Sequence, residues 1–273
     1  MTGATPIIAN NLPIETVLKC YMKPKKFLLF LNNGIKLTRA DIFTKDDPFE
    51  AEYTEASYSL FKEFKITYKK PNEPRQNYCD FLKDQCNRIR KHAFVSCWTK
   101  GSKENVALWR LYGGNGNGVA IQTTVGKLVK EIEYATTNTE QGKRLHLLKG
   151  CKKRIVKIKY IDHHQTEYQY IIDSTNPNPT NILHYKNEGY EYENEIRIIF
   201  DTYQNAETGK KAHSRLGESI SIRIRPDTVI DKILISPYAC KCYFDSVKKI
   251  MSEYDATSKV EWSHLKFVPG EPS

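Results

Sequence analysis

A short segment, residues 191–200 (EYENEIRIIF), carries charged side chains at every second position and then becomes apolar. Alternate residues of an extended strand share a face, so we expect Glu193, Glu195 and Arg197 to lie on one side of a strand. Neighbouring carboxylates repel each other unless a cation answers them, and Arg197 is therefore expected to pair with a glutamate. Two interpretations follow from the pattern, an exposed strand face or the charged strand of an active site.

Three other motifs could also carry chemistry. In DDPFE (46–50), Asp-Pro favours a turn, with Phe49 as its anchor and Glu50 as the start of a helix, and a role of Asp47 and Glu50 near a substrate is the alternative. GGNGNG (113–118) lacks the Gly-Lys-Ser/Thr ending of a P-loop and follows an expected helix, so we interpret it as a helix stop and turn. His163 and His164 are adjacent, and in a strand they would point to opposite faces rather than to one metal ion.

The cysteine pattern indicates reduced thiols. There are seven, an odd number without a CxxC pair: Cys20, Cys79, Cys86, Cys97, Cys151, Cys240 and Cys242. Such a set is not typical of a disulfide framework or of a structural zinc site. CKC at 240–242 is the nearest approach to a ligand pair, and no second pair follows it at a suitable spacing. We therefore expect no metal site and no disulfide.

The net charge of +10, with a pI near 9.1, favours a polyanionic partner such as RNA or DNA, or an anionic cofactor. The densest cluster lies at 149–160 and supplies the candidate nucleic-acid-binding residues Lys152, Lys153, Arg154, Lys157 and Lys159. A solvated face is the alternative for any single cluster. No apolar run reaches the ~18 residues of a membrane-spanning helix, and no basic residue precedes the first apolar stretch, so we expect a cytoplasmic protein without a membrane partner.

Helical and strand patterns are interleaved without a linker, which predicts one domain spanning 1–273 with its core at about 15–255. Strands are expected at 16–22, 35–38, 93–99, 118–124, 154–161, 194–200, 219–225 and 231–236. Helices are expected at 24–34, 55–66, 76–91, 103–112 and 239–254. This order is not a regular βαβ alternation, and it predicts an α+β fold with mixed or antiparallel sheets and flanking helices.

Three segments together resemble a widespread bacterial family of domains without an assigned function, often encoded beside phage-defence and toxin genes. They are KLTRADIFTKDDPFE (36–50), FVSCWTKGSKENVALWRLYGGNGNGVAI (94–121) and YEYENEIRIIF (190–200). The resemblance covers residues 20 to 240 or so and rests on the order and spacing of short motifs. The chain departs from the family pattern at Asp46 (usually Asn), Trp98 (Phe), Leu108 (Met) and Tyr190 (Trp).

The layout also resembles the ADP-ribosyltransferase superfamily, which implies a fold of that type with NAD as co-substrate. The resemblance implies that Glu195 hydrogen-bonds the ribose 2′-hydroxyl and favours an oxocarbenium-like state, while Glu193 orients or deprotonates the acceptor. Tyr21, Lys23 and Arg39 are the alternatives for the first residue that meets NAD. Ser96 and Thr99 offer hydroxyls for the ribose and the pocket wall, and Trp98, Trp109 and Tyr112 offer aromatic faces for nicotinamide or adenine, with core packing as the alternative for two of the three. Arg197 either orients the glutamates or contacts the pyrophosphate.

The expected function is that of a toxin-like enzyme transferring ADP-ribose from NAD to a nucleic acid, RNA rather than DNA, in phage defence or a toxin–antitoxin system. An antitoxin or a chaperone protein is a candidate partner. Two alternatives stay open. One is a protein ADP-ribosyltransferase or an NAD hydrolase, and the other is a sensor that binds nucleic acid or nucleotide without catalysis.

Overall fold

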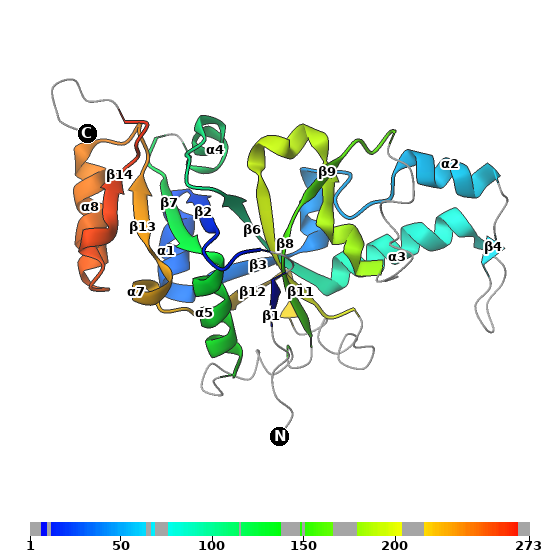
Figure 1. Cartoon of the computed structure of the whole chain (residues 1–273), viewed down its shortest axis with the longest axis horizontal. Coiled ribbons are helices and arrows are strands. Elements are labelled where there is room, and N and C mark those ends of the chain that lie inside the picture. The colour runs from blue at the N-terminus through cyan, green and yellow to red at the C-terminus, as the bar shows by residue number, and fades with distance from the viewer. Residues whose placement is uncertain are drawn as a thin grey trace. The chain divides into compact units, whose positions relative to one another are not determined.

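The computed structural model describes residues 7–9, 12–63, 67–68, 76–114, 116–137, 148, 151–165, 179–203 and 216–266 (Figure 1). The chain divides into two compact units, each assembled from separate stretches of sequence. The first comprises Met1–Lys36, Ser96–Lys149 and Ser221–Ser273, and the second comprises Leu37–Val95 and Gly150–Ile220. That all of 1–273 forms a single domain stays a prediction.

The first unit is organised around a mostly antiparallel sheet. Its strands include β2 (Val17–Met22), β7 (Val119–Thr124), β13 (Lys232–Ile235), β14 (Val260–Trp262) and the end of β6 (Ala93–Lys100). Strand β2 pairs antiparallel with both β6 and β7, β7 pairs antiparallel with β13, and β13 pairs parallel with β14. The short strand β1 (Ile7–Ala9) also belongs to this unit.

Helices pack on this sheet and close its core. They are α1 (Pro24–Asn33), α4 (Val106–Tyr112), α5 (Val125–Thr137), α7 (Pro226–Val229), α8 (Lys241–Ser252) and the 3₁₀ turn η7 (Thr257–Lys259). Helix α8 lies against β14, at the orange and red end of the ribbon in Figure 1. One core cluster joins α4 to the sheet through Tyr21, Leu108, Trp109, Ala120 and Leu234.

A disulfide between Cys240 and Cys242 overturns the prediction that every cysteine is a free thiol. The prediction rested on the absence of CxxC spacing, but one intervening residue is enough when the chain turns into a helix between the two cysteines. By loop-closure entropy, a crosslink this short stabilises the fold by only about 1.6 kcal/mol, half the value for a 15-residue loop. The other five cysteines are free thiols as predicted.

The second unit contains three short two-stranded pairings and one longer one. The longer one joins β8 (Lys152–Lys157) antiparallel to β11 (Glu195–Asp201). Two of the short ones are also antiparallel: β3 (Ile35–Arg39) with the start of β6, and β4 (Thr67–Tyr68) with β5 (Gln76–Asn77). The third short one joins β9 (Lys159–Ile161) parallel to β10 (Tyr185–Asn187). Strand β12 (Ser219–Ile222) adds to β3. The helical elements are η1 (Ala40–Lys45), α2 (Glu55–Glu63), α3 (Tyr78–His92), η5 (Pro179–His184) and η6 (Glu188–Glu193).

Mixed helices and mostly antiparallel strands agree with the predicted α+β class. The predicted strands and helices are present to within a few residues, except that the strand expected at 154–161 is divided into β8 and β9, which belong to different sheets, and that residues 64–66 of the helix expected at 55–66 lie outside the described residues. GGNGNG begins as predicted with a helix stop, since the Gly113 N–H closes α4 on the carbonyl of Trp109. Helix α5 was not predicted, and residues 188–193 form a 3₁₀ helix where strand alternation was expected. In the parts of the chain described above, no helix has the length and apolarity needed to cross a bilayer.

Candidate active site

Five charged side chains of the second unit form a continuous chain of ion pairs in the order Glu50, Arg197, Glu195, Lys186, Glu193. The Arg197 guanidinium grips Glu50 with two bonds, Nη1 to Oε1 at 2.6 Å and Nη2 to Oε2 at 2.8 Å. Its Nε donates to Oε1 of Glu195 at 2.7 Å. The Lys186 ammonium then bridges Glu195, at 3.1 Å from Oε2, and Glu193. Arg197 thus pairs with a glutamate, as predicted.

The two glutamates of the ENE motif do not reach Lys186 by strand alternation. Glu193 ends η6, Asn194 adopts a left-handed conformation with φ 44° and ψ 53°, and β11 begins only at Glu195. Asparagine is one of the few residues that tolerate this conformation, and the reversal it produces turns both carboxylates toward the same ammonium group. The prediction that one strand face carries Glu193, Glu195 and Arg197 is therefore wrong in geometry.

Burial is graded along the ion-pair chain. The side chains of Glu50, Glu195 and Arg197 are each 2% exposed, whereas that of Glu193 is 8% exposed and that of Lys186 is 11% exposed. A molecule arriving from solvent therefore meets Lys186 and Glu193 before the other three. The inner residues can act on it mainly through their charge and by holding the outer pair in place.

Tyrosine side chains surround the outer end. The Lys186 ammonium lies 4.5 Å from the ring centre of Tyr190, whose hydroxyl donates to the carbonyl of Asp46 at 2.9 Å. Tyr192 is exposed, and Tyr160 lies beside Glu195, whose backbone N–H its hydroxyl accepts at 2.7 Å. Aromatic faces next to a cation and a carboxylate are suited to a planar ring bearing polar groups.

The electrostatics of the cluster are dominated by burial. Desolvation raises the pKa of Glu50 above its ordinary value, while the neighbouring Arg197 charge and its hydrogen bonds pull that pKa down. Burial also raises the pKa of Tyr160 to about 12, and the charges of Glu195 and Glu193 add to that effect. Formally the cluster holds three carboxylates and two cations. An excess of negative charge in a dry environment is suited to stabilising a positive charge that develops on a substrate.

The DDPFE segment places Glu50 in the cluster by way of a tight turn. The backbone N–H of Phe49 donates to Oδ1 of Asp47 at 3.0 Å, and the N–H of Glu50 donates to the Asp47 carbonyl at 3.1 Å. The Phe49 ring stacks on His163 at a centroid distance of 4.8 Å. The predicted turn with a phenylalanine anchor is confirmed. Glu50 does not start a helix, however, because α2 begins at Glu55 and Glu50 is used by Arg197.

Sequence reasoning missed Lys186 altogether. It lies in β10, in the sequence HYKNEG, and no spacing rule singles it out from the many other lysines. The available signal was a charge count, because three carboxylates and one arginine left at least one carboxylate without a cation. That argument identifies the need for a lysine or arginine and not its position.

Most residues predicted to bind the cofactor belong to the first unit, whereas the ion-pair chain belongs to the second. Those of the first unit are Tyr21, Lys23, Ser96, Trp98, Thr99, Trp109 and Tyr112. Trp98 and Trp109 are buried, and Tyr21 packs edge-on against Trp109 at 4.9 Å, so all three are core residues there. Arg39, in the second unit, is engaged by Asp41 at 2.6 and 2.8 Å. Of the predicted set, only Arg197 lies in the ion-pair chain.

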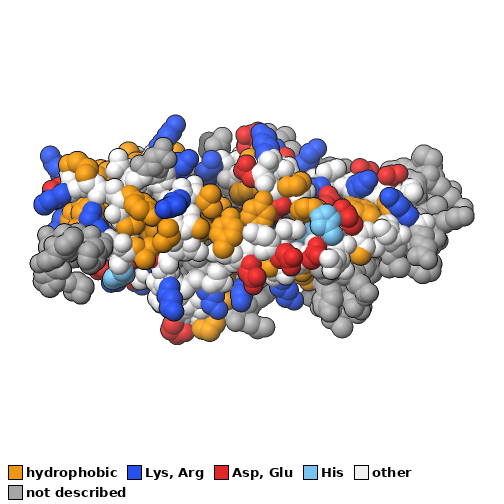
Figure 2. Space-filling view, turned by 90° about the horizontal axis from the view of Figure 1, so that it is seen from above, with side chains coloured by type: hydrophobic (Ala, Val, Ile, Leu, Met, Phe, Trp, Pro, Cys, Tyr) orange, Lys and Arg blue, Asp and Glu red, His pale blue; other side chains and the backbone are white. Residues whose placement is uncertain are grey.

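The basic segment 152–159 is less available than its sequence indicated. Lys153 and Arg154 are each 2% exposed, and Arg154 donates to Thr180 at 2.8 Å and pairs with Asp201 at 3.4 Å. Burial removes these two from any nucleic-acid-binding surface. Lys157 and Lys159 are exposed and Lys152 is half-buried. On the face drawn in Figure 2, lysines and arginines occur among apolar and acidic side chains rather than in one continuous stripe.

No group of histidine, cysteine, aspartate and glutamate in the described ranges is arranged to hold a metal ion. In the ion-pair chain, Arg197 and Lys186 engage both oxygens of Glu50 and both oxygens of Glu195.

One family model matches the chain, over residues 108–198, and its description is "protein of unknown function (DUF2971)". The matched range includes Lys186, Glu193, Glu195 and Arg197. Glu50 lies outside it, because residue 50 precedes the first matched residue. No curated protein and no solved structure matches. The chain is thus similar, over about a third of its length, to a family whose function has not been assigned.

Proposed function

We propose that this protein is an ADP-ribosyltransferase-like enzyme that cleaves the nicotinamide–ribose bond of NAD and transfers ADP-ribose to a nucleic acid. The observation that carries the proposal is the chain of three carboxylates around two cations, graded from buried Glu50 to the more accessible Glu193. Breaking that bond builds positive charge on the ribose ring, and a preorganised excess of carboxylate charge favours such a transition state.

The graded burial suggests a division of roles. We assign Glu193, together with Lys186, to contact with the substrate, because they lie at the outer end. Glu195 has both oxygens engaged, by Arg197 and by Lys186, and is better suited to setting the local field and holding Lys186. This assignment moves the substrate-contacting role from Glu195, as the resemblance implied, to Glu193.

The proposed acceptor is RNA. The support for it is the net charge of +10, which attracts a polyanion to the surface whatever its sequence. Lys157 and Lys159 are the exposed cations of the basic segment and the first candidates for phosphate contacts. Buried Lys153 and Arg154 have no part in this surface. A role in phage defence or in a toxin–antitoxin pair belongs to the same proposal.

A non-catalytic nucleotide sensor is the second candidate, and the burial of the cluster favours it. Every carboxylate of the ion-pair chain is paired with a cation, and the side chains of Glu50, Glu195 and Arg197 are each only 2% exposed. Such a network can fix the shape of a binding surface without taking part in a reaction. The sensor predicts that NAD or RNA binds and that neither is altered.

The test is incubation of the purified full chain with labelled NAD and, separately, RNA, DNA or cell-lysate protein, followed for nicotinamide release and transfer of label. Glu193→Gln keeps the shape of the side chain and removes its charge, and we expect it to lower the transfer rate by ~10²-fold or more. Glu191→Gln is the matched control, because Glu191 lies in the same 3₁₀ helix and is exposed. We expect it to retain the wild-type rate.

Each result distinguishes the candidates. Label on RNA that disappears in Glu193→Gln and persists in Glu191→Gln supports the transferase, and label on protein only, or nicotinamide release without transfer, changes the acceptor. Unaltered NAD in all mixtures eliminates the enzyme. Thermal unfolding of both variants shows whether a lost activity reflects chemistry or a lost fold.

A further inference from the structure

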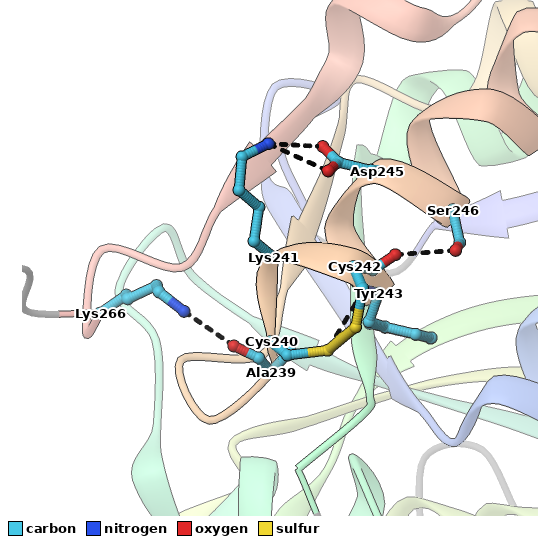
Figure 3. The surroundings of a disulfide bond; sticks show 8 residues. All are labelled: Ala239, Cys240, Lys241, Cys242, Tyr243, Asp245, Ser246 and Lys266. Carbon is cyan, nitrogen blue, oxygen red and sulfur yellow. Dashed lines mark hydrogen bonds and ion pairs between the residues drawn. A yellow bond between two sulfur atoms is a disulfide. The ribbon is translucent and has the colours of Figure 1, made fainter.

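Cys240 and Cys242 lie at the beginning of helix α8, with Lys241 between them (Figure 3). Cys240 is the N-cap residue and Cys242 is in the first turn, and both are exposed. The disulfide therefore joins two sulfurs of one helical turn at the protein surface. Reagents and other proteins can reach it without any opening of the fold.

This disulfide adds little to the stability of the helix end. The backbone of the same turn is already closed, because the N–H groups of Tyr243 and Phe244 reach the carbonyl of Cys240 at 3.1 and 3.3 Å. A crosslink that spans one intervening residue also removes little chain entropy, because the loop it closes is very short. Reduction would thus leave α8 in place, and a purely structural purpose is a weak explanation for the pair.

The helix end distinguishes the two sulfurs. The Tyr243 N–H donates to Sγ of Cys240 at 3.4 Å, and no such bond is made to Cys242 among the bonds of the described residues. A helix N-terminus carries partial positive charge and stabilises a thiolate placed at its cap. No acidic residue lies in the first turn of α8 to oppose this effect. Cys240 is therefore the sulfur that better accepts a negative charge when the bond opens.

Three of the other cysteines have the opposite environment. Cys20, Cys86 and Cys151 are buried, and burial raises the pKa of each thiol, to about 12 for Cys151. Buried thiols of this kind stay protonated and are unreactive at neutral pH. Within the described residues, the exposed sulfurs are confined to the Cys240–Cys242 pair.

We propose that Cys240 and Cys242 form a thiol–disulfide exchange site that accepts two electrons from a dithiol and returns them to a disulfide. A thiolate of the dithiol attacks Sγ of Cys242, the Cys240–Cys242 bond breaks, and its electron pair leaves on Cys240 as a thiolate, to which the Tyr243 N–H donates a hydrogen bond. The second thiolate of the dithiol attacks the mixed disulfide, and Cys242 leaves and takes a proton from water. The dithiol ends as a disulfide and the protein as a dithiol. Oxidation by a disulfide substrate is the reverse.

The experiment uses the full chain, with dithiothreitol and its oxidised form as the redox couple. After equilibration at a series of ratios, free thiols are trapped with an alkylating reagent and assigned by mass spectrometry. We expect Cys240 and Cys242 to become alkylated together, as one two-electron transition, while Cys20, Cys86 and Cys151 show no dependence on the ratio. Cys97→Ser is the control variant and is expected to leave the transition unchanged.

A second measurement tests the roles of the two sulfurs. Cys242→Ser leaves Cys240 as the one cysteine of the pair, and Cys240→Ser leaves Cys242. The alkylation rate of that cysteine is measured over a range of pH, and we expect the rate to reach half its maximum at a lower pH for Cys240 than for Cys242. Both variants alter exposed side chains, and circular dichroism verifies that α8 is intact. A pair that stays reduced at every ratio, or two sulfurs with the same pH profile, overturns the proposal.

Discussion

Removing Arg197 is the most severe test of the ion-pair chain. Arg197→Met keeps most of the volume and removes the charge that answers Glu50 and Glu195. Glu195 retains Lys186 as a partner at 3.1 Å, but Glu50 loses both of its bonds to the guanidinium and stays 2% exposed. Leaving one buried charge without its partner costs about 3–5 kcal/mol of unfolding free energy. We expect a loss in this range at pH 7.

The loss should depend on pH with a definite sign. Burial raises the pKa of Glu50, and the Arg197 charge opposes that rise. Without Arg197 the folded-state pKa of Glu50 rises further above its unfolded value of about 4.3. A carboxyl with a raised folded pKa contributes stability that is complete below its unfolded pKa and is lost as pH rises through the folded pKa. The gap between variant and wild type should therefore shrink as pH falls from 7.5 to 5.

The assay is urea unfolding of both proteins at several pH values, with Arg110→Met as control. Arg110 is exposed on α4, and its replacement should change the unfolding free energy by less than about 0.5 kcal/mol. Arg197→Lys keeps the charge without the planar fork that grips Glu50, and we expect an intermediate loss. If Arg197→Met destabilises no more than Arg110→Met, or if its loss does not change with pH, the ion-pair chain does not have the energetic role inferred for it.

Two further substitutions test the first unit. Gly34→Ala should lower the unfolding free energy by more than about 2 kcal/mol, because Gly34 has φ +82° and an added Cβ would lie 1.9 Å from the Ile222 carbonyl oxygen. The control Gly217→Ala, with φ +69° and no atom within 4 Å of the added Cβ, should lower it by only about 1 kcal/mol. Equal losses in thermal unfolding would contradict the predicted clash. Lys19→Met should lower the unfolding free energy in urea by about 1–3 kcal/mol, because the fully buried Lys19 ammonium donates to the carbonyls of residues 101, 102 and 103. The control Lys25→Met replaces an exposed lysine and should be neutral. A neutral Lys19→Met would show that the three carbonyls find other donors.

The regular elements were predictable because their signals are local. Pro24 at the first helical position and Gly34 at the end delimit α1, and the apolar spacing in 76–91 predicts α3. Helix α5 was missed because VGKLVKEIEYATT begins directly after a strand: its N-cap, Thr124, accepts the Lys127 N–H at 3.3 Å but is also the last residue of β7, and it was assigned to the strand. With Thr124 assigned to the strand, the helix was visible only through its periodicity, and its apolar positions were not separated from those of the preceding strand.

The candidate site was predictable only in part, because its geometry depends on pairings between distant segments. The ENEIR motif supplied three of its five members, and the pairing of Arg197 with a glutamate followed from charge repulsion alone. Glu50 reaches the cluster through a tight turn nearly 150 residues away in sequence, at a separation of 147 from Arg197. Lys186 carries no local signal at all. The left-handed conformation of Asn194, and not the alternation of a strand, brings the carboxylates of Glu193 and Glu195 together.

The distribution of burial in the cluster gives a physical reason to look for function at one end of it. A fully buried ion network costs about as much in desolvation as it returns in attraction, and apolar side chains of similar volume would stabilise a fold at least as well. Glu50, Glu195 and Arg197 alone could thus be replaced by a hydrophobic contact without loss. Lys186 and Glu193 are the least buried of the five, with side chains 11% and 8% exposed, and charged partners on their buried side keep them in a fixed geometry. The inner three residues are then best understood as the support that holds Lys186 and Glu193 side by side, with the ring of Tyr190 over the Lys186 ammonium.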